Sequence, residues 1–441
     1  MRKAWLIPMV AVLVEAAVSG VEPAPKKPAA RKPAARKAAP VPRANPEQRA
    51  AVEAQMADAV DLGIQNAAAM VPFYEMLYRR QQQGTAEPLR VLQFGDSHSA
   101  SDDWPGELRL RFQQKFGDGG AGFVQAGRPF AGFRRLEVKG TMSRGWKPEG
   151  LLAREGDGLY GLGGVSLATE RAGETVTLEA AGETLEIFFL RQPGGGAFVV
   201  EDNGEALETV RTEGDAGPGY YSKELAAGGH HLTLRTLEAL PVRVFGWVLE
   251  KRGGMTWETL GINGAQMDVM LGWDEQLWKS HVERRNPALV VLAYGTNEAR
   301  RSDWSYDGYR SALAQVVKRI RAAAPAASIL MVGPPDQGVR SRRGVSPHQG
   351  VDQVLAAQRD AAMETGCAFW NLRAAMGGRG SMKQWVQAGL AQGDYVHLTS
   401  PGYRLVGDSL YELIMGQYGV FVTVRRQLLG TNENGPATKT H

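Results

Sequence analysis

The amino-acid sequence predicts a three-layer α/β protein, in which a parallel sheet lies between helices, with an all-β sandwich of jelly-roll type inserted into it. Two observations support this class. After Met255, apolar strand-like runs alternate with amphipathic helical stretches, the order that builds parallel sheets covered on both faces. Between residues 140 and 252, helical periodicity is absent and glycines separate short β-rich runs. A buried strand at Leu89–Phe94 precedes that block, so the block interrupts one α/β domain.

The first 19 residues have the features of an export signal. Arg2 and Lys3 are followed by an apolar run, Ala4–Val14, and then by small residues. This run is shorter than the roughly 18 residues of a membrane-spanning helix. We therefore expect a cleaved signal in preference to a permanent anchor, and export to the periplasm or the cell envelope.

Residues 20–45 form a linker of Ala, Pro, Lys and Arg that cannot build a core. We expect an extended spacer, with weak electrostatic tethering to an anionic wall or membrane surface as the alternative. The chain has a net charge of +4, but its first 43 residues alone carry +7, which leaves −3 on the rest. This distribution does not indicate nucleic-acid binding by the folded part. The single cysteine, Cys367, excludes a disulfide framework and a thiol metal cluster.

The first part of the α/β domain is predicted at residues 46–139 and begins with a helix. Apolar residues at helical spacing predict helical structure over Pro46–Gln83. The buried strand Leu89–Phe94 follows, and Gly95-Asp96-Ser97 is the turn that leaves it. Apolar residues four positions apart then predict a helix from Trp104 to Phe116.

The inserted β-sandwich is predicted at residues 140–252. The sequence Asp202-Asn203-Gly204 predicts a tight hairpin, because Asn and Gly accept the positive φ of its turn. The predicted strands are Val165–Ala168, Thr175–Leu178, Leu185–Leu190, Phe198–Glu201, Leu232–Thr236 and Val242–Glu250.

Residues 253–425 are predicted to complete the α/β domain, and residues 426–441 to form a disordered tail. The predicted strands are Ala288–Ala293, Ser328–Val332 and Ala368–Leu372. The predicted helices are Trp273–Glu283, Tyr306–Ala323, Val351–Thr365 and Gly402–Met415.

Three polar segments lie at the ends of these elements. Ser97 follows the first strand, Asn297 follows a later one within Gly-Thr-Asn-Glu, and Asp394 and His397 come just before the last helix. The carboxyl ends of parallel strands meet at one edge of a sheet, so we expect these side chains to converge. Together they supply the groups that acyl transfer needs. Ser97 is the expected nucleophile, His397 its base, Asp394 the carboxylate that orients the imidazole, and Asn297 an oxyanion donor.

Two neighbours of these residues have open roles in the sequence. His98 either contacts substrate or packs in the turn after Ser97. Glu298 either orients Asn297 or faces solvent.

These segments resemble the four sequence blocks of the SGNH (GDSL-type) hydrolase family, which contribute Ser, Gly, Asn and His. The resemblance implies a flavodoxin-like three-layer fold and an oxyanion hole made by the backbone N–H groups of Ser97 and Gly264 and the amide of Asn297. The Gly block is Gly-Ile-Asn-Gly-Ala at residues 261–265, where Gly261 is the competing candidate. The G-x-S-x-G elbow of α/β-hydrolases is absent around Ser97.

Residues 91–102 and 117–123 narrow this resemblance to bacterial peptidoglycan O-acetylesterases. Those enzymes also carry a β-sandwich, similar to a carbohydrate-binding module, between their Ser and Gly blocks. The resemblance implies an O-acetylated polysaccharide as partner and substrate, with peptidoglycan as the expected polymer. The acetyl ester on the 6-hydroxyl of muramic acid would be removed without a cofactor or metal ion. Two alternatives stay open: a polysaccharide O-acetyltransferase with the same triad, and a carbohydrate-binding protein with a vestigial esterase site.

Several other motifs favour structural roles. Residues 117–122 match G-x-G-x-x-G but follow a predicted helix, so we expect a glycine-rich turn at the rim of the site and no dinucleotide. His230 and His231 would point to opposite faces of a strand, which does not suit a pair of metal ligands. Trp247 and Trp257 are expected in the core, with stacking on sugar rings as the alternative.

Overall fold

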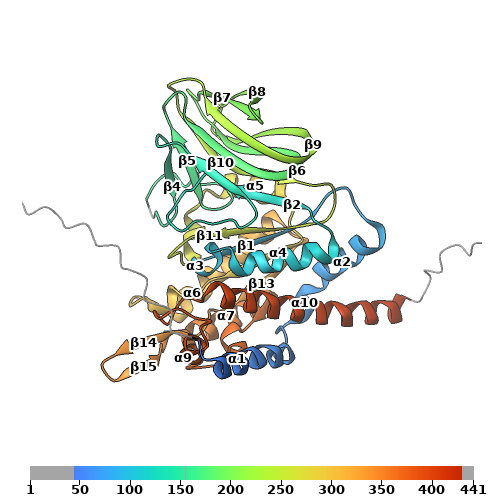
Figure 1. Cartoon of the computed structure of the whole chain (residues 1–441), viewed down its shortest axis with the longest axis vertical. Helices are drawn as coiled ribbons and strands as arrows, with labels where there is room; N and C mark the ends of the chain where they lie inside the picture. Colours follow the sequence, from blue (N-terminus) through green and yellow to red (C-terminus); the bar gives the residue numbers. More distant parts are fainter. Residues whose placement is uncertain (1–43, 154, 430–441) are drawn as a thin grey trace, which may run out of the picture. The chain divides into compact units, whose positions relative to one another are not determined.

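The computed structural model describes residues 44–153 and 155–429 (Figure 1). The predicted export signal, nearly all of the predicted linker and residues 430–441 of the predicted tail lie outside the described residues. Within the described ranges, no helix combines the length and the hydropathy needed to cross a membrane.

A five-stranded parallel sheet forms the centre of the α/β domain, which confirms the predicted class. The strand order is β11-β1-β12-β13-β16, and every neighbouring pair runs parallel. β1 therefore lies between two strands that both follow the insert in sequence. The strands are β1 (Leu89–Gly95), β11 (Met255–Gly261), β12 (Leu289–Ala293), β13 (Ser328–Val332) and β16 (Ala368–Trp370).

Helices cover both faces of this sheet because consecutive strand residues point to opposite sides. Val91 joins the apolar cluster that includes residues of α2 (Val71–Gln83), α4 (Asp103–Phe116) and α10 (Ser400–Leu429). Its neighbour Leu92 joins the cluster of the opposite face. That cluster contains residues of α5 (Glu275–Arg285), α6 (Tyr306–Ala323) and α7 (Gly350–Thr365).

The helical stretch predicted over Pro46–Gln83 is interrupted in the structure. α1 (Pro46–Asp58) and α2 are separated by the short 3-10 helices η1 (Ala59–Leu62) and η2 (Ala67–Met70). Gly63 has φ 68° and Asn66 has φ 52°, values at which a helix cannot continue. Between them Gln65 forms a bridge to Phe369, next to the edge strand β16. The predicted helical stretch is thus interrupted where Gln65 contacts the edge strand of the sheet.

The last helix is longer than predicted. α10 continues past Met415 to Leu429, so residues 426–429 belong to a helix and correct the predicted start of the tail. Packing against α2 explains the extension. The Tyr418 ring lies 6.2 Å from Tyr74, and Arg425 forms a 2.8 Å ion pair with Glu75. These contacts are long-range and give no signal within the helix sequence itself.

The inserted β domain is an antiparallel sheet of nine strands (Figure 1). The central order is β4-β5-β10-β6-β9-β7-β8, with β2 on β10 and β3 on β6, so the layers expected of a sandwich are joined in one hydrogen-bonded sheet. The strands are β2 (Gly120–Gln125), β3 (Lys139–Met142), β4 (Lys147–Gly150), β5 (Val165–Thr169), β6 (Thr175–Arg191), β7 (Ala197–Asp202), β8 (Glu205–Arg211), β9 (Gly217–Thr236) and β10 (Val242–Glu250). The two runs predicted within residues 175–190 are one strand with a register shift at Gly182.

This sheet begins before the predicted boundary at residue 140. β2 pairs with β10, and Phe123 of β2 is buried. The stretch at residues 117–122 is therefore not simply a turn at the rim of the site, because its second half is strand. A side chain at Gly120 would lie 2.8 Å from the Leu249 carbonyl, so close approach of the two strands requires glycine there.

The insert and the α/β domain share an apolar core. Phe188 of β6 and Phe245 of β10 belong to the same cluster as Leu277 of α5. His281 of α5 lies between them, with its ring centroid 4.9 Å from Phe188 and 5.0 Å from Phe245. Its burial lowers the pKa of His281 to about 3, so the ring is neutral at physiological pH. The insert is thus packed onto the helix layer as part of the same core.

A buried ion-pair network joins the two sheets next to this core. Arg285, at the end of α5, contacts Glu250 of β10 and Glu258 of β11, each at 2.5 Å. Arg90 of β1 contacts the same Glu250 at 2.7 Å. Burial alone raises the pKa of Glu250, but Arg285 and Arg90 outweigh burial and lower it to about 2.

We predict that Arg285→Ala lowers the free energy of unfolding by about 3–5 kcal/mol at pH 7, because it leaves buried Glu258 without a counter-charge and Glu250 with Arg90 alone. The folded-state pKa of Glu250 lies below its ordinary value of 4.5, so its stabilising contribution is present above pH 4.5 and is lost toward pH 2. The deficit of the variant should shrink over the same range. Urea unfolding at several pH values measures both effects.

The matched control is Lys279→Ala on the same helix. Lys279 pairs with Glu283 at 3.5 Å on the exposed side, so its removal should cost about 0.5 kcal/mol or less. A deficit below 1 kcal/mol for Arg285→Ala at pH 7 would contradict a role for the network in holding the sheets together.

Candidate active site

The sequence-predicted site residues meet at the carboxyl edge of the five-stranded sheet. Ser97 follows β1, Gly264 follows β11, Asn297 follows β12, and His397 precedes α10. These four residues line one cleft of about 640 Å³. The sheet topology therefore brings together segments that are far apart in sequence.

A tight connection places Ser97 at this edge. β1 ends at Gly95, and the one-turn helix α3 (Ser97–Ala100) begins two residues later. The Asp96 side chain caps α3 by accepting a 2.9 Å hydrogen bond from the His98 N–H. A side chain at Gly95 would lie 2.2 Å from Ser99 Oγ and 2.8 Å from the Ala293 carbonyl. Glycine is therefore required where the chain turns out of the strand.

Ser97, His397 and Asp394 form a hydrogen-bonded chain. Ser97 Oγ lies 3.0 Å from His397 Nε2, and His397 Nδ1 lies 2.8 Å from Asp394 Oδ2. The other carboxylate oxygen accepts the backbone N–H groups of Val396 and His397 at 2.9 and 3.0 Å. Tyr395, the residue between Asp394 and Val396, has φ 61°. This backbone conformation turns the chain so that the next two N–H groups face the Asp394 carboxylate.

The protonation of this chain follows from its surroundings. Partial burial raises the pKa of Asp394, but the hydrogen bonds from His397 and the two backbone N–H groups lower it to about 2. Asp394 is therefore ionised at neutral pH and holds a proton on Nδ1 of His397. The lone pair of Nε2 then faces Ser97 Oγ, the geometry in which an imidazole acts as a general base.

Asn297 and Gly264 lie on the cleft beside Ser97. Asn297 Nδ2 donates to the Ala265 carbonyl at 2.8 Å, and its second N–H makes no hydrogen bond to the described chain. Gly264 has φ 80° and is exposed. Gly261 is buried instead, and a side chain there would lie 2.3 Å from the Ala100 nitrogen of α3. Of the two candidate glycines, Gly264 is thus the one that lines the cleft.

Glu298 is buried and does not face solvent. It accepts the backbone N–H of Met267 at 2.8 Å and that of Gly295 at 3.0 Å. Burial raises the pKa of Glu298 to about 7, against the lowering effect of these hydrogen bonds. The side chain ties the segment of Asn297 to the segment that follows Gly264. Of the two open roles, orientation of Asn297 is the one that this placement favours.

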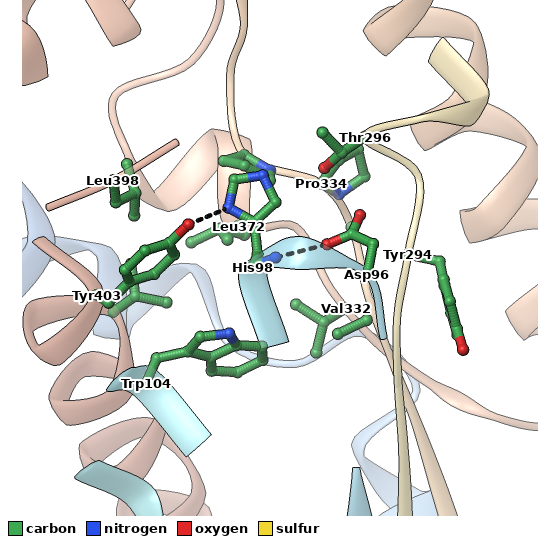
Figure 2. A pocket seen from close by; sticks show the side chains of 14 residues that line it. Asp96, His98, Trp104, Tyr294, Thr296, Val332, Pro334, Leu372, Leu398 and Tyr403 are labelled. Carbon is green, nitrogen blue, oxygen red and sulfur yellow. Dashed lines mark hydrogen bonds between the residues drawn. The ribbon is translucent and has the colours of Figure 1, made fainter. Parts of the chain in front are cut away.

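His98 is also buried, and its ring points toward Tyr403 (Figure 2) and packs against the ring of His397. The two imidazole rings stack with centroids 5.3 Å apart and planes 29° apart. Tyr403 Oη lies 2.9 Å from His98 Nδ1. Burial and the neighbouring His397 lower the pKa of His98 to about 3, so the ring is neutral. His98 therefore belongs to the packing of the turn and supports the ring of the base.

Tyr403 is a further residue of the site, to which the sequence pattern assigned no role. It lies in the first turns of α10, contacts His98, and lines the cleft. Figure 2 shows it with Trp104 and Leu398 around the same small pocket behind the site. Its position six residues after His397 could have indicated this role. The predicted helix begins between the two residues, so an aromatic side chain in its first turn can face back toward His397.

Of the residues predicted to have structural roles, Trp247, Trp257 and His230 are buried. Trp247 and Trp257 are each 1% exposed, which excludes stacking on a sugar in this conformation. His230 Nδ1 contacts Asp202 at 2.7 Å and is buried, whereas His231 is exposed. Over the described part of the chain, no group of three or more His, Cys, Asp or Glu residues is placed to hold a metal ion.

Comparison with known proteins agrees with this arrangement. The sequence model of the GDSL-like Lipase/Acylhydrolase family matches residues 226–405. This range contains Asn297, Asp394 and His397 but excludes Ser97, which precedes the inserted strands. No curated protein matches the chain significantly.

A solved structure of a peptidoglycan O-acetylesterase matches with a TM-score of 0.66 and 30% sequence identity, covering 78% of this chain and 96% of that chain. A family two carbohydrate esterase from Clostridium thermocellum, in complex with cellohexaose, gives 0.28 and 15%, covering 58% and 95%. The acetyl xylan esterase AlAXEase gives 0.28 and 19%, covering 34% and 77%. The last two TM-scores are too low to bear on function.

The first match extends over almost the whole length of the solved enzyme, and the family's sequence model covers the second part of the α/β domain. The Ser, Asn and His segments of that family converge here on one cleft. The chain therefore belongs to the GDSL-like lipase/acylhydrolase (SGNH hydrolase) family and is a carboxylic ester hydrolase.

Proposed function

We propose that this protein is an exported serine esterase that removes O-acetyl groups from a cell-wall polysaccharide, namely peptidoglycan. The observation that carries the proposal is the hydrogen-bonded chain from Asp394 through His397 to Ser97, which opens onto a cleft. The 30% identity with a peptidoglycan O-acetylesterase supports the substrate. The signal-like pattern of residues 1–19 supports export.

The proposed reaction proceeds through an acyl-enzyme. Ser97 Oγ attacks the acetyl carbonyl while His397 Nε2 takes its proton. The backbone N–H groups of Ser97 and Gly264 and the free N–H of Asn297 bind the oxyanion. Collapse of the tetrahedral intermediate breaks the bond to the sugar oxygen, which takes the proton from His397 and leaves as a hydroxyl. Water, activated by the same base, then releases acetate from Ser97.

The residues around the cleft suit a carbohydrate. Hydroxyl, amide and charged side chains line most of it, and they match the hydrogen-bonding capacity of sugar hydroxyls. These residues are Ser101, Asp103, Arg134, Asn263, Gln392 and Ser400. The apolar side chains among the lining residues are Leu398 and the ring of Tyr403.

The substrate is tested by acetate release from O-acetylated peptidoglycan and from O-acetylated xylan. We expect the wild-type protein to release acetate from peptidoglycan, Ser97→Ala to release none, and Ser311→Ala, an exposed serine on α6, to behave as wild type. Preference for xylan would contradict the substrate while keeping the chemistry. Full activity of Ser97→Ala would contradict the mechanism.

Asp394→Asn should lower kcat by about 10³–10⁴-fold and leave the fold intact, because the amide no longer fixes the productive tautomer of His397. With a pKa of about 2, Asp394 is ionised throughout the range from pH 5 to pH 8, so the loss should be present across that whole range. Asp307→Asn, an exposed carboxylate on α6, is the control. A loss smaller than tenfold, measured with a small acetyl ester, would remove Asp394 from the catalytic chain.

Asn297→Ala should lower kcat by about 10²–10³-fold with little change in KM, since its N–H acts on the oxyanion more than on the bound ester. Asn297→Asp keeps the size of the side chain but replaces the donor with an acceptor, and it should be at least as damaging. Steady-state kinetics with a small acetyl ester separates kcat from KM. A rise in KM alone would assign Asn297 to substrate binding.

A further inference from the structure

A small hairpin beside the active site carries a concentration of positive charge. It consists of β14 (Gly338–Ser341) and β15 (Gly344–Pro347), which form a two-stranded sheet of their own and project from the fold (Figure 1). Three arginines on it are exposed, and none of them forms an ion pair with a described residue; they are Arg340, Arg342 and Arg343. Residues 338–347 contain no acidic residue.

Neither composition nor turn chemistry accounts for these arginines. The chain after residue 43 carries a net charge of −3, so a local charge of +3 runs against its surroundings. Arg342 and Arg343 occupy the two-residue turn, where Asn, Gly or Asp are the residues that favour tight turns. Two adjacent like charges at an exposed tip repel each other, so these arginines do not stabilise the hairpin itself.

The hairpin is attached to both segments that carry catalytic residues. The Gly338 N–H donates to the Tyr395 carbonyl at 2.8 Å, and the Arg340 guanidinium lies 5.3 Å from the centre of the Tyr395 ring. Tyr395 stands between Asp394 and His397 in the chain. On the other side, Gln337 Nε2 donates to the Thr296 carbonyl at 3.1 Å, next to Asn297. The base of the hairpin is thus hydrogen-bonded to the two segments that adjoin Asp394, His397 and Asn297.

We propose that Arg340, Arg342 and Arg343 form an anion-binding surface that holds carboxylates of the polymer chain next to the ester being cleaved. This inference rests on the proposed function, because peptidoglycan carries the free carboxylates of its peptide stems along its length, whereas xylan esters lie on a largely neutral backbone. Guanidinium groups bind carboxylates in bidentate geometry and remain charged at every relevant pH. The surface selects the polymer and leaves the acyl chemistry to the cleft.

Binding is measured first, with insoluble peptidoglycan sacculi from which the O-acetyl groups have been removed, so that the result does not depend on esterase activity. The variant Arg342→Ala/Arg343→Ala should bind about tenfold more weakly than the wild type at low ionic strength, since two exposed ion pairs are lost. The difference should disappear at about 0.5–1 M salt, where exposed charges are screened. Co-sedimentation gives both dissociation constants.

The matched control is Arg144→Ala/Lys147→Ala. These exposed cations of the insert form no ion pair with another described residue. Their replacement removes the same amount of charge as the hairpin variant, but from another surface. The control should bind sacculi as the wild type does. Equal weakening by both double variants would show a general charge effect and overturn the inference, as would unchanged binding of Arg342→Ala/Arg343→Ala.

Two further measurements distinguish polymer binding by the hairpin from catalysis and from attachment to a membrane. The ratio of kcat/KM on O-acetylated peptidoglycan to kcat/KM on p-nitrophenyl acetate should fall about tenfold in the hairpin variant, in line with its weaker binding. If the wild type binds de-O-acetylated sacculi through the hairpin but releases no acetate from O-acetylated peptidoglycan, the proposed function fails and the anion-binding surface stands. Hairpin-dependent binding to anionic phospholipid vesicles, with sacculus binding unaffected, would overturn the polymer as the ligand.

Discussion

The active site depends on how closely α3 approaches the ends of β1 and β11. Gly95 and Gly261 are register partners in these strands, and neither position has room for a side chain. Because these glycines have no side chains, the one-turn helix α3 can lie directly on the edge of the sheet. This contact determines the position of Ser97 Oγ. The same closeness brings Gly264, three residues after Gly261, to the cleft that Ser97 lines. Backbone packing therefore fixes the nucleophile and the proposed oxyanion donor relative to each other.

Burial around the cleft assigns different charge states to chemically similar groups. Asp394 accepts three hydrogen bonds and remains an anion, whereas buried Glu298 has a pKa of about 7. His397 reaches the cleft, whereas His98 behind it is buried and neutral. A neutral ring at that place adds no positive charge next to the imidazolium that forms during acyl transfer. The base can take up a proton without repulsion from its stacked neighbour.

Much of the α/β domain could be predicted because its signals are local. Strands such as Leu289–Ala293 are short apolar runs, and polar residues at their carboxyl ends must converge in a parallel sheet. The features that were mispredicted depend on distant contacts. Gln65 meets Phe369, Tyr418 meets Tyr74, and Gly120 lies against Leu249. The burial of Glu298 and His98 could not be predicted either, because it depends on segments that are distant in sequence and pack against them. The catalytic roles of the converging residues remain predictions.

The position of the insert within the chain has a consequence for how the protein folds. β1 has two sheet neighbours, β11 and β12, and both are synthesised only after the whole inserted domain. Until then the apolar residues of β1 have no strand to pair with, and the residues of α4 that pack on the completed sheet have no surface to cover. Contacts of such large sequence separation form slowly and leave unpaired edges exposed in the meantime. The inserted sheet, whose strands pair largely with each other, is then the part able to fold first and offer β6 and β10 as a surface on which the catalytic sheet closes.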